Sequence, residues 1–257
     1  MTDYERLFRL DGRRAVVVGA GAGIGRACAE ALAAFGADTV FADRDPAAAE
    51  EAAAAAGGRA FRLDVTSAED IARAAAELEP ADVLVIAPGF NVRRPLIETS
   101  DDDFDRVVDV NLKGPYRLMK AFGGGMAERG RGSIVLFSSF RAVVVEPGQG
   151  IYAACKAGIV QMGRAFADEL GTRGVRVNAI APGPTETPLT QQIKSDPAWW
   201  DAYRDKTIVR RWAQPSEIAG AVVYLASDAS SFTTGALYMV DGGWTAADGR
   251  FRPAGSP

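Results

Sequence analysis

The chain has 257 residues, of which 48% are apolar, and its net charge is −4 at pH 7. This size fits one α/β domain with a sizeable core, so we expect a single domain over residues 1–257. The acidic balance argues against nucleic acid or a membrane surface as partner. The chain has no histidine, so catalytic triads and most zinc sites lack their usual residue, and we expect no metal. Two cysteines, no apolar run of ~18 residues and no signal-peptide pattern favour a cytoplasmic protein.

Short apolar runs alternate with helical patterns along the chain. This alternation predicts a doubly wound, mostly parallel sheet with helices on both faces and a ligand at the carboxyl ends of the strands. The core is expected over about 10–244, with a substrate lid at about 184–212 and a frayed tail at 246–257. The expected strands are 14–19, 38–42, 60–63, 83–86, 133–137, 175–181 and 236–240. The expected helices are 23–35, 47–56, 68–78, 101–128, 151–171 and 215–226.

The first expected strand leads directly into a glycine-rich segment. Gly19, Gly23 and Gly25 are spaced as G-x-x-x-G-x-G, and an apolar helix follows. Glycines let the backbone turn sharply and approach a pyrophosphate, which then binds at the positive N-terminus of the helix. The alternative is a glycine-rich turn without a ligand. Strand, glycines and helix together favour a Rossmann-type dinucleotide site.

An acidic residue ends the second expected strand. Asp43 lies eighteen residues after Gly25, where a carboxylate accepts hydrogen bonds from the ribose hydroxyls and repels a 2′-phosphate. We therefore expect NAD(H) rather than NADP(H). Arg44 would bind a 2′-phosphate if Asp43 turned away, which keeps NADP open as an alternative. Asp43 would otherwise only open the turn that follows it.

Tyr152 and Lys156 lie four residues apart on an expected helix and so share one face. A phenol has a pKa of ~10, and lowering that pKa to about 7 requires roughly 4 kcal/mol. A single exposed ammonium is too weak for this, so a second positive charge or a desolvated site is implied. An oxidised nicotinamide ring would supply such a charge. We interpret Tyr152 as a general acid/base rather than a packed aromatic, with Ser139, rather than Ser138, on the substrate oxygen.

These motifs resemble those of the short-chain dehydrogenases/reductases over nearly the whole chain, from about Leu10 to Trp244. The segments Asn91–Leu96 and 210–217 are most similar to gluconate 5-dehydrogenase and related sugar-acid or polyol dehydrogenases. The motifs that carry the family resemblance are Gly19-x-x-x-Gly23-x-Gly25, Asp64-Val65, Asn111 in Val-Asn-Leu-Lys-Gly, Ser139, Tyr152-x-x-x-Lys156, Pro182-Gly183-x-x-x-Thr187 and Val240-Asp-Gly-Gly243.

The resemblance implies an oxidoreductase that interconverts a secondary alcohol and a ketone by hydride transfer, and a homotetramer. It also implies that Lys156 binds the nicotinamide ribose and that Asn111 bends its helix and holds a water in a proton relay. The catalytic residues are then Asn111, Ser139, Tyr152 and Lys156. The cofactor-binding residues are Gly19, Gly23, Ile24, Gly25, Asp43, Arg44, Asp64, Val65, Gly89, Tyr152, Lys156, Pro182, Gly183 and Thr187.

The chain departs from the family pattern beside the glycine-rich loop. The family usually has Asn-Asn-Ala-Gly after its fourth strand, where this chain has Ile86-Ala87-Pro88-Gly89. Val18 replaces the usual threonine before Gly19. The lost polar groups put local rigidity and some cofactor affinity in doubt, but not the chemistry.

Arginines near the expected site are the clues to the substrate. They are Arg93, Arg94 and Arg141, and one of them, Arg94 ahead of Arg141, is expected to bind an acidic or polyhydroxylated substrate, because a guanidinium pairs with a carboxylate through two hydrogen bonds. Solvated surface arginines are the alternative. A second enzyme reading is reduction of 3-oxoacyl groups on a carrier protein, for which Arg129 and Arg131 would form a docking patch. A third reading is a dinucleotide-binding protein without turnover, which has no need of Ser139, Tyr152 and Lys156.

Overall fold

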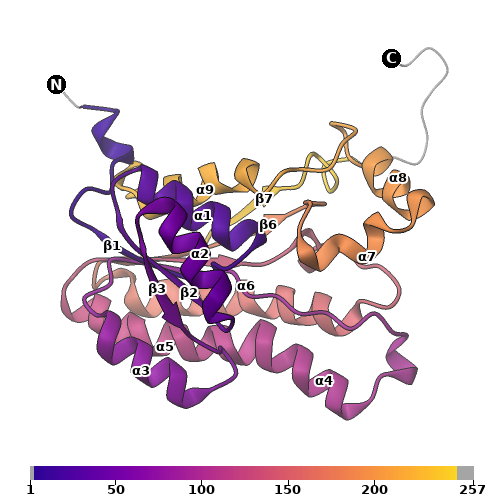
Figure 1. The fold of residues 1–257 in the computed structure, drawn as a ribbon, viewed down its shortest axis with the longest axis horizontal. Coiled ribbons are helices and arrows are strands. Elements are labelled where there is room, and N and C mark those ends of the chain that lie inside the picture. Colours follow the sequence, from indigo (N-terminus) through magenta and orange to yellow (C-terminus); the bar gives the residue numbers. More distant parts are fainter. Residues whose placement is uncertain (1–2, 248–257) are drawn as a thin grey trace.

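The computed structural model describes residues 3–247, which form one doubly wound α/β unit (Figure 1). Its seven strands pair in the order β3-β2-β1-β4-β5-β6-β7, and every pair is parallel. The predicted fold class is therefore confirmed, and each strand boundary lies within one residue of its expected position. The part of the expected tail from residue 248 onward lies outside the described residues. The strands are β1 (Arg14–Val18), β2 (Asp38–Asp43), β3 (Arg59–Arg62), β4 (Val83–Ile86), β5 (Gly132–Phe137), β6 (Val175–Pro182) and β7 (Leu237–Val240).

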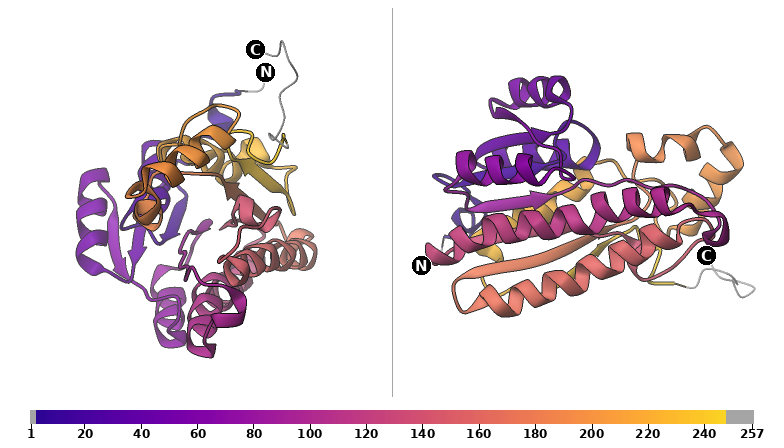
Figure 2. Two further views of the ribbon diagram at one scale, coloured as in Figure 1. Left: turned by 90° about the vertical axis from the view of Figure 1, so that its right-hand side faces the viewer. Right: turned by 90° about the horizontal axis from the view of Figure 1, so that it is seen from below.

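Helices cover both faces of the sheet (Figures 1 and 2). One face carries α1, α2 and α9, and the other carries α3, α5 and α6. No helix within residues 3–247 is long and apolar enough to cross a membrane. The helices are α1 (Gly23–Ala34), α2 (Pro46–Ala56), α3 (Ala68–Leu78), α4 (Asp101–Val108), α5 (Gly114–Glu128), α6 (Gly150–Gly171), α7 (Gln191–Lys194), α8 (Pro197–Lys206) and α9 (Ser216–Ala226).

The apolar run of β1 supplies both layers of the core. Ala15 and Val17 pack among the helices of one face, whereas Val16 and Val18 pack among those of the other. All four side chains are fully buried. Successive side chains of a strand point to opposite faces, so a continuous apolar run is what a central parallel strand requires.

The helix expected at 101–128 is interrupted. A π-helical turn, Asp109–Lys113, separates α4 from α5. Such a turn holds one extra residue and shifts the helix faces relative to each other, and it is frequent at functional sites. Asn111 lies in this turn, so the local distortion that the resemblance implied at this residue is present.

The expected lid, 184–212, contains more regular structure than its prolines indicated. Helices α7 and α8 form within it, and they project beyond the carboxyl end of the sheet (Figure 1). Asp196 caps α8, because its side chain accepts hydrogen bonds from the backbone N–H groups of Ala198 and Trp199. Ile193, Tyr203 and Trp212 of this segment form an apolar cluster with Phe140 and Trp244, which lie outside it.

Candidate active site

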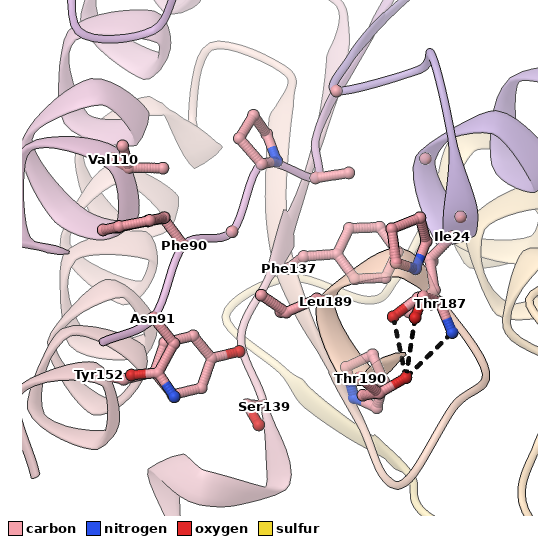
Figure 3. Close-up of a pocket in the computed structure, with 18 of the residues that line it drawn as sticks. Ile24, Phe90, Asn91, Val110, Phe137, Ser139, Tyr152, Thr187, Leu189 and Thr190 are labelled. Carbon is pink, nitrogen blue, oxygen red and sulfur yellow. Dashed lines mark hydrogen bonds between the residues drawn. The ribbon is translucent and has the colours of Figure 1, made fainter. Parts of the chain in front are cut away.

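A cavity of about 680 Å³ lies at the carboxyl end of the sheet (Figure 3). The segments that follow β1 and β4 line it, and these neighbouring strands mark the point where the strand order reverses. Open α/β sheets bind their ligands at such a point. The cavity brings together all the residues expected to bind a cofactor, namely Gly19, Gly23, Ile24, Gly25, Asp43, Arg44, Asp64, Val65, Gly89, Tyr152, Lys156, Pro182, Gly183 and Thr187.

The turn between β1 and α1 requires glycine at its closest approaches. A Cβ atom on Gly25 would lie 2.0 Å from the carbonyl oxygen of Gly19, and Gly19 itself has a φ of 81°. Ala22 caps α1 without a side-chain hydrogen bond, so the first N–H groups of the helix are left for another partner. These groups and the helix dipole make the end of α1 beside the cavity a site for a phosphate group.

Asp43 is fixed beside the glycine-rich turn. Its carboxylate accepts hydrogen bonds from the backbone N–H of Gly21 at 2.9 Å and of Asp45 at 3.0 Å. These bonds hold the carboxylate at the end of β2, where it lines the cavity. Arg44 follows it in the chain and lines the same cavity, so the structure places both residues that sequence reasoning weighed for the cofactor's ribose.

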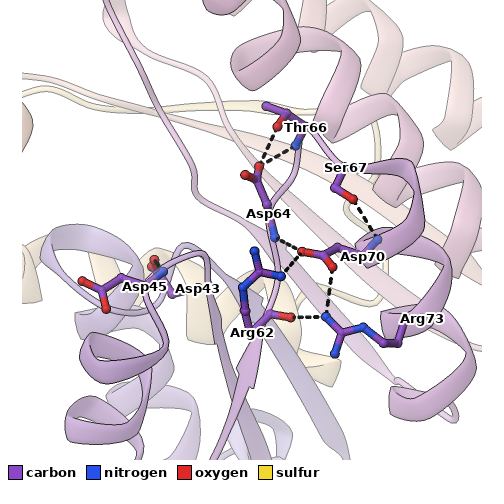
Figure 4. A network of polar contacts seen from close by, with 8 residues as sticks. All are labelled: Asp43, Asp45, Arg62, Asp64, Thr66, Ser67, Asp70 and Arg73. Carbon is purple, nitrogen blue, oxygen red and sulfur yellow. Dashed lines mark hydrogen bonds and ion pairs between the residues drawn. The ribbon is translucent and has the colours of Figure 1, made fainter.

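A polar network supports the turn after β3 (Figure 4). Asp64 accepts hydrogen bonds from the backbone N–H and the hydroxyl of Thr66, at 2.9 and 2.8 Å. The backbone N–H of Asp64 donates to Asp70, which also pairs with Arg62 and Arg73. Burial acts to raise the pKa of Asp70, but these partners together lower it. The carboxylate of Asp64 is thus committed to its own turn, and the backbone at Asp64 and Val65 lines the cavity.

The hydroxyl of Tyr152 points toward Ser139 (Figure 3). Burial raises the pKa of this phenol to about 12, although a hydrogen bond with Ser139 and the charges of Arg141 and Arg93 act to lower it. Burial therefore opposes the phenolate. Burial alone therefore does not explain a lowered pKa of Tyr152, and positive charge near the phenol is the explanation that its surroundings favour.

Lys156 lies one helical turn after Tyr152 on α6, with its Nζ 5.5 Å from the centre of the tyrosine ring. The side chain is buried, its Nζ donates to the carbonyl oxygen of Phe137 at 2.9 Å, and burial lowers its pKa to about 8. Ser138 donates its hydroxyl to the carbonyl oxygen of Lys156 at 2.7 Å. Because Ser138 is occupied in this way, Ser139 is the serine left beside Tyr152.

Asn111 is fully buried in the π-helical turn. Its Nδ2 donates to the carbonyl oxygens of Val107 and Phe90, at 2.8 and 2.6 Å, and its Oδ1 accepts from the backbone N–H of Phe90 at 3.3 Å. Asn111 is not among the cavity-lining residues. It ties the loop after β4 to α4, and its role in a proton relay stays a prediction.

The altered segment after β4 packs closely on the glycine-rich turn. The backbone N–H of Ala87 donates to the carbonyl oxygen of Val18 at 3.0 Å. A Cβ atom on Gly19 would lie 3.0 Å from the nitrogen of Pro88, and one on Gly25 would lie 3.2 Å from the Cβ of Ala87. Small apolar contacts thus stand where the family usually has amides.

Comparisons with known proteins agree with this geometry. A protein-family model described as enoyl-(acyl carrier protein) reductase matches residues 19–245. Galactitol 2-dehydrogenase (L-tagatose-forming) of Cereibacter sphaeroides is 42% identical over 95% of this chain and 99% of its own. The chain belongs to the short-chain dehydrogenase/reductase family. Gluconate 5-dehydrogenase of Gluconobacter oxydans is 34% identical over 93% of this chain and 97% of its own. The structure of a Burkholderia cenocepacia gluconate 5-dehydrogenase with NADP and tartrate has a TM-score of 0.90 at 32% identity, covering 95% of this chain and all of the other.

This family member is thus a dinucleotide-dependent oxidoreductase, similar to enzymes named for secondary alcohols of polyols and sugar acids. Its arginines differ from expectation. Arg94 is not among the cavity-lining residues, and it lies 3.5 Å from Asp103 with 47% of its side chain exposed. Arg93, its neighbour, lines the cavity instead. Arg141 also lines the cavity, but its side chain is 5% exposed and donates to Glu146 at 3.0 Å. The structure therefore gives no support to Arg94 as a substrate ligand.

The expected carrier-protein patch is in the wrong place for this dehydrogenase/reductase. Arg129 and Arg131 precede β5, at the amino end of the strand, whereas the cavity lies at the carboxyl ends. Both are also paired, Arg129 with Glu79 at 2.5 Å and Arg131 with Asp82 at 2.9 Å. The docking role that the sequence suggested for this segment is therefore not supported.

Sequence reasoning missed a polar cluster beside the catalytic groups. Glu146 lies in the loop before α6, and Tyr203 and Gln149 contact it from α8 and from the start of α6. Tyr203 and Gln149 line the cavity. No known motif marks these residues, and Tyr203 meets Glu146 only through the folding of distant segments.

Proposed function

We propose that the protein is an NAD(H)-dependent oxidoreductase that interconverts a secondary alcohol and a ketone, acting on a sugar acid, a polyol or a similar hydroxy compound. The observation that carries the proposal is the meeting of Tyr152, Ser139 and Lys156 in the cavity that the glycine-rich turn opens into. Relatives named for galactitol, D-threitol and gluconate support the substrate class.

In the proposed mechanism Tyr152 takes the proton of the substrate hydroxyl in oxidation and returns it in reduction. Ser139 holds the reacting oxygen beside the phenol. When bound, the nicotinamide accepts or donates the hydride. Lys156 supplies one of the positive charges that the phenolate needs against its burial, and it would hold the nicotinamide ribose. Asn111 would link a water to Lys156 as the exit for the proton.

The preference for NAD(H) rests on Asp43. Its carboxylate is fixed by two backbone N–H groups at the point where the cofactor's ribose is expected, and it disfavours an added phosphate there. Arg44 keeps NADP as the second candidate. Relatives of known structure hold NADP, including a 2-deoxy-D-gluconate 3-dehydrogenase candidate of Agrobacterium tumefaciens, so kinetics with both cofactors are the direct test.

The decisive experiment is a reduction screen with NAD⁺ and NADP⁺ over alditols, sugar acids and simple secondary alcohols, with wild type and Tyr152→Phe. We expect the variant to bind NADH as the wild type does and to lose at least about 10²-fold in kcat, because the acid/base is gone while the ring remains. The neighbouring serine supplies a control: Ser138→Ala removes a hydroxyl that donates to the Lys156 backbone, so its loss in kcat should be far smaller. Full turnover by Tyr152→Phe would refute the mechanism.

We also propose the homotetramer that the sequence indicates. Phe232 is fully exposed in the loop before β7, and Met239 on that strand, at the edge of the sheet, is 37% exposed. Exposed apolar side chains at a sheet edge favour pairing with a second copy, and symmetric assembly is the usual outcome. Light scattering should give the mass of four chains, and a monomer at micromolar concentration would rule this out.

A further inference from the structure

One carboxylate oxygen gathers the polar cluster beside the catalytic groups. Glu146 Oε2 accepts hydrogen bonds from four side chains, two close to it in the chain and two distant from it. They are Arg93 after β4 at 3.0 Å, Arg141 after Ser139 at 3.0 Å, Tyr203 of the lid at 2.6 Å, and Gln149 at the start of α6. An internal anion therefore already holds both arginines that line the cavity next to Tyr152.

Glu146 is ionised at neutral pH. Burial acts to raise its pKa, but the hydrogen bond from Tyr203 and the charges of Arg141 and Arg93 outweigh burial and lower it. An ionised carboxylate only accepts hydrogen bonds, so each donor that points at Glu146 is committed to it.

Arg93 cannot offer a complete two-pronged fork to a second carboxylate. A guanidinium binds a carboxylate bidentately either through both Nη atoms or through Nε and one Nη. In Arg93 the Nη1 atom is engaged with Glu146, and the Nε atom is enclosed by protein without a partner among the described residues. The fork of the two Nη atoms therefore lacks Nη1, and the fork that uses Nε lacks Nε, so neither fork can bind a substrate carboxylate through both donors. The guanidinium also lies over the Trp199 ring, 4.6 Å from its centre, which holds it in this orientation.

Arg141 is still less available. Its Nη2 donates both to Glu146 and to the Tyr203 hydroxyl, at 3.0 and 2.7 Å. Its guanidinium lies among the rings of Phe140, Tyr203 and Trp244, at 4.3, 5.6 and 5.5 Å from their centres. With 5% of its side chain exposed, it contributes charge to the cavity but no free fork.

The three remaining cationic side chains that line the cavity either have other partners or lie away from this wall. Lys156 is buried and donates to the Phe137 carbonyl oxygen. Arg106 lies 3.4 Å from Asp103 and over the Phe90 ring, with 64% of its side chain exposed. Arg44 follows β2 at the cofactor's expected ribose.

We propose that the substrate is a neutral polyhydric alcohol, and that Glu146 determines this specificity by occupying the arginines that would otherwise bind a substrate carboxylate. The proposal rests on the proposed function and narrows its substrate class. This wall presents uncharged amides: Asn91 and Gln149 line the cavity, and the Nδ2 of Asn91 donates to the Oε1 of Gln149 at 3.0 Å. Each amide nitrogen carries two N–H bonds and uses one of them in the hydrogen bonds described, so the second can donate to a substrate hydroxyl group.

The charges of the cluster agree with a neutral substrate. Two arginines and one glutamate leave a single unit of positive charge close to Tyr152. The charges of Arg141 and Arg93 act to lower the tyrosine's pKa, so they favour the phenolate that oxidation needs. A substrate carboxylate at this wall would cancel that charge and oppose the proton transfer.

The test compares an alditol with the aldonate of the same length and configuration, in wild type and in Glu146→Gln. Glutamine keeps an oxygen acceptor of similar shape but removes the charge, which releases the arginine forks. We expect the wild type to favour the alditol in kcat/KM by about tenfold or more, and Glu146→Gln to move the ratio toward the aldonate by about tenfold. The matched control is Glu217→Gln on α9, which removes an arginine-paired carboxylate outside the cavity and should leave the ratio unchanged.

Equal kcat/KM for alditol and aldonate in the wild type would overturn the proposal, and this comparison needs no variant. An unchanged ratio in folded Glu146→Gln would do the same. If the wild type turns over neither compound, the proposed function fails, and binding then decides the inference separately. In that case an aldonate should raise the Tm of the NADH-saturated Glu146→Gln protein and leave the Tm of the wild type unchanged. A rise in the wild type contradicts the role of Glu146.

Discussion

Replacing Lys156 by methionine should remove activity and yet stabilise the folded protein at neutral pH. Burial lowers the pKa of Lys156 from 10.5 to about 8. Each pKa unit corresponds to ~1.36 kcal/mol, so carrying this ammonium in the folded state costs about 3 kcal/mol at pH 7. Methionine fills a similar volume without the charge. The variant loses the hydrogen bond to the Phe137 carbonyl oxygen, which contributes about 1 kcal/mol. The free energy of unfolding at pH 7 should therefore rise by about 2 kcal/mol relative to wild type.

The size of this stability difference depends on pH. Because the folded pKa lies below the unfolded one, the cost of Lys156 is fully present below pH 8 and disappears as the pH rises toward 10.5. The advantage of Lys156→Met should therefore fall by about 2–3 kcal/mol between pH 7 and pH 10. Above pH 10 the raised pKa of Tyr152 makes the folded protein less stable as the pH rises, so the two proteins are compared only up to pH 10.

Urea unfolding of the cofactor-free protein at pH 7 and pH 10, at one protein concentration, measures this difference. Lys120→Met, which removes an exposed lysine from α5, is the control and should show no such dependence on pH. A difference between Lys156→Met and wild type that is the same at both pH values would refute the assignment of a strained, buried charge. Loss of turnover together with a gain in stability would show that Lys156 is required for activity although it lowers the free energy of unfolding.

Three further changes test the cofactor site and the base. Asp43→Asn should shift kcat/KM toward NADP by about tenfold or more, because one charge that repels a 2′-phosphate is removed; an unchanged NAD/NADP ratio would exclude Asp43 as the selector. Gly25→Ala should cost about 3 kcal/mol or more, since its Cβ would lie 2.0 Å from the Gly19 carbonyl oxygen, and urea unfolding reads this directly. The rate of alcohol oxidation at saturating NAD⁺ should rise between pH 7 and pH 9, because the pKa of Tyr152 is about 12 without cofactor and oxidation needs the phenolate. If this rate did not change with pH while hydride transfer limits turnover, a group other than Tyr152 would take the proton.

Much of the fold and the cofactor site is predictable from the sequence, because both depend on local patterns. The apolar run before Gly19 is continuous as a central parallel strand requires, and it is buried on both faces. The motif residues follow the ends of different strands, and parallel strands place those ends at one edge. Tyr152 and Lys156 need only the period of one helix to share a face.

The substrate side is less predictable, because it depends on contacts between distant segments. Arg93 and Arg94 are adjacent in the chain, and only the path of the loop after β4 decides that Arg93 reaches the cavity. Glu146 has no motif, and two of its partners, Arg93 and Tyr203, are more than fifty residues away in the chain. The π-helical turn at Asn111 is indicated only by the family resemblance, since one extra residue in a helix hardly alters the spacing of its apolar positions.

All four tryptophans of the chain, Trp199, Trp200, Trp212 and Trp244, lie in or against the lid. Trp200 stacks on Trp212 with 3.8 Å between ring centres, and Arg93 lies over Trp199. The sheet and the helices on its two faces contain no tryptophan, so the tryptophan fluorescence of the protein originates in the segment 184–212 and in the residue packed against it. A movement of α8 would change the stacking and the charge around these rings. Stopped-flow tryptophan fluorescence is therefore a label-free measurement of whether this segment moves when a ligand binds.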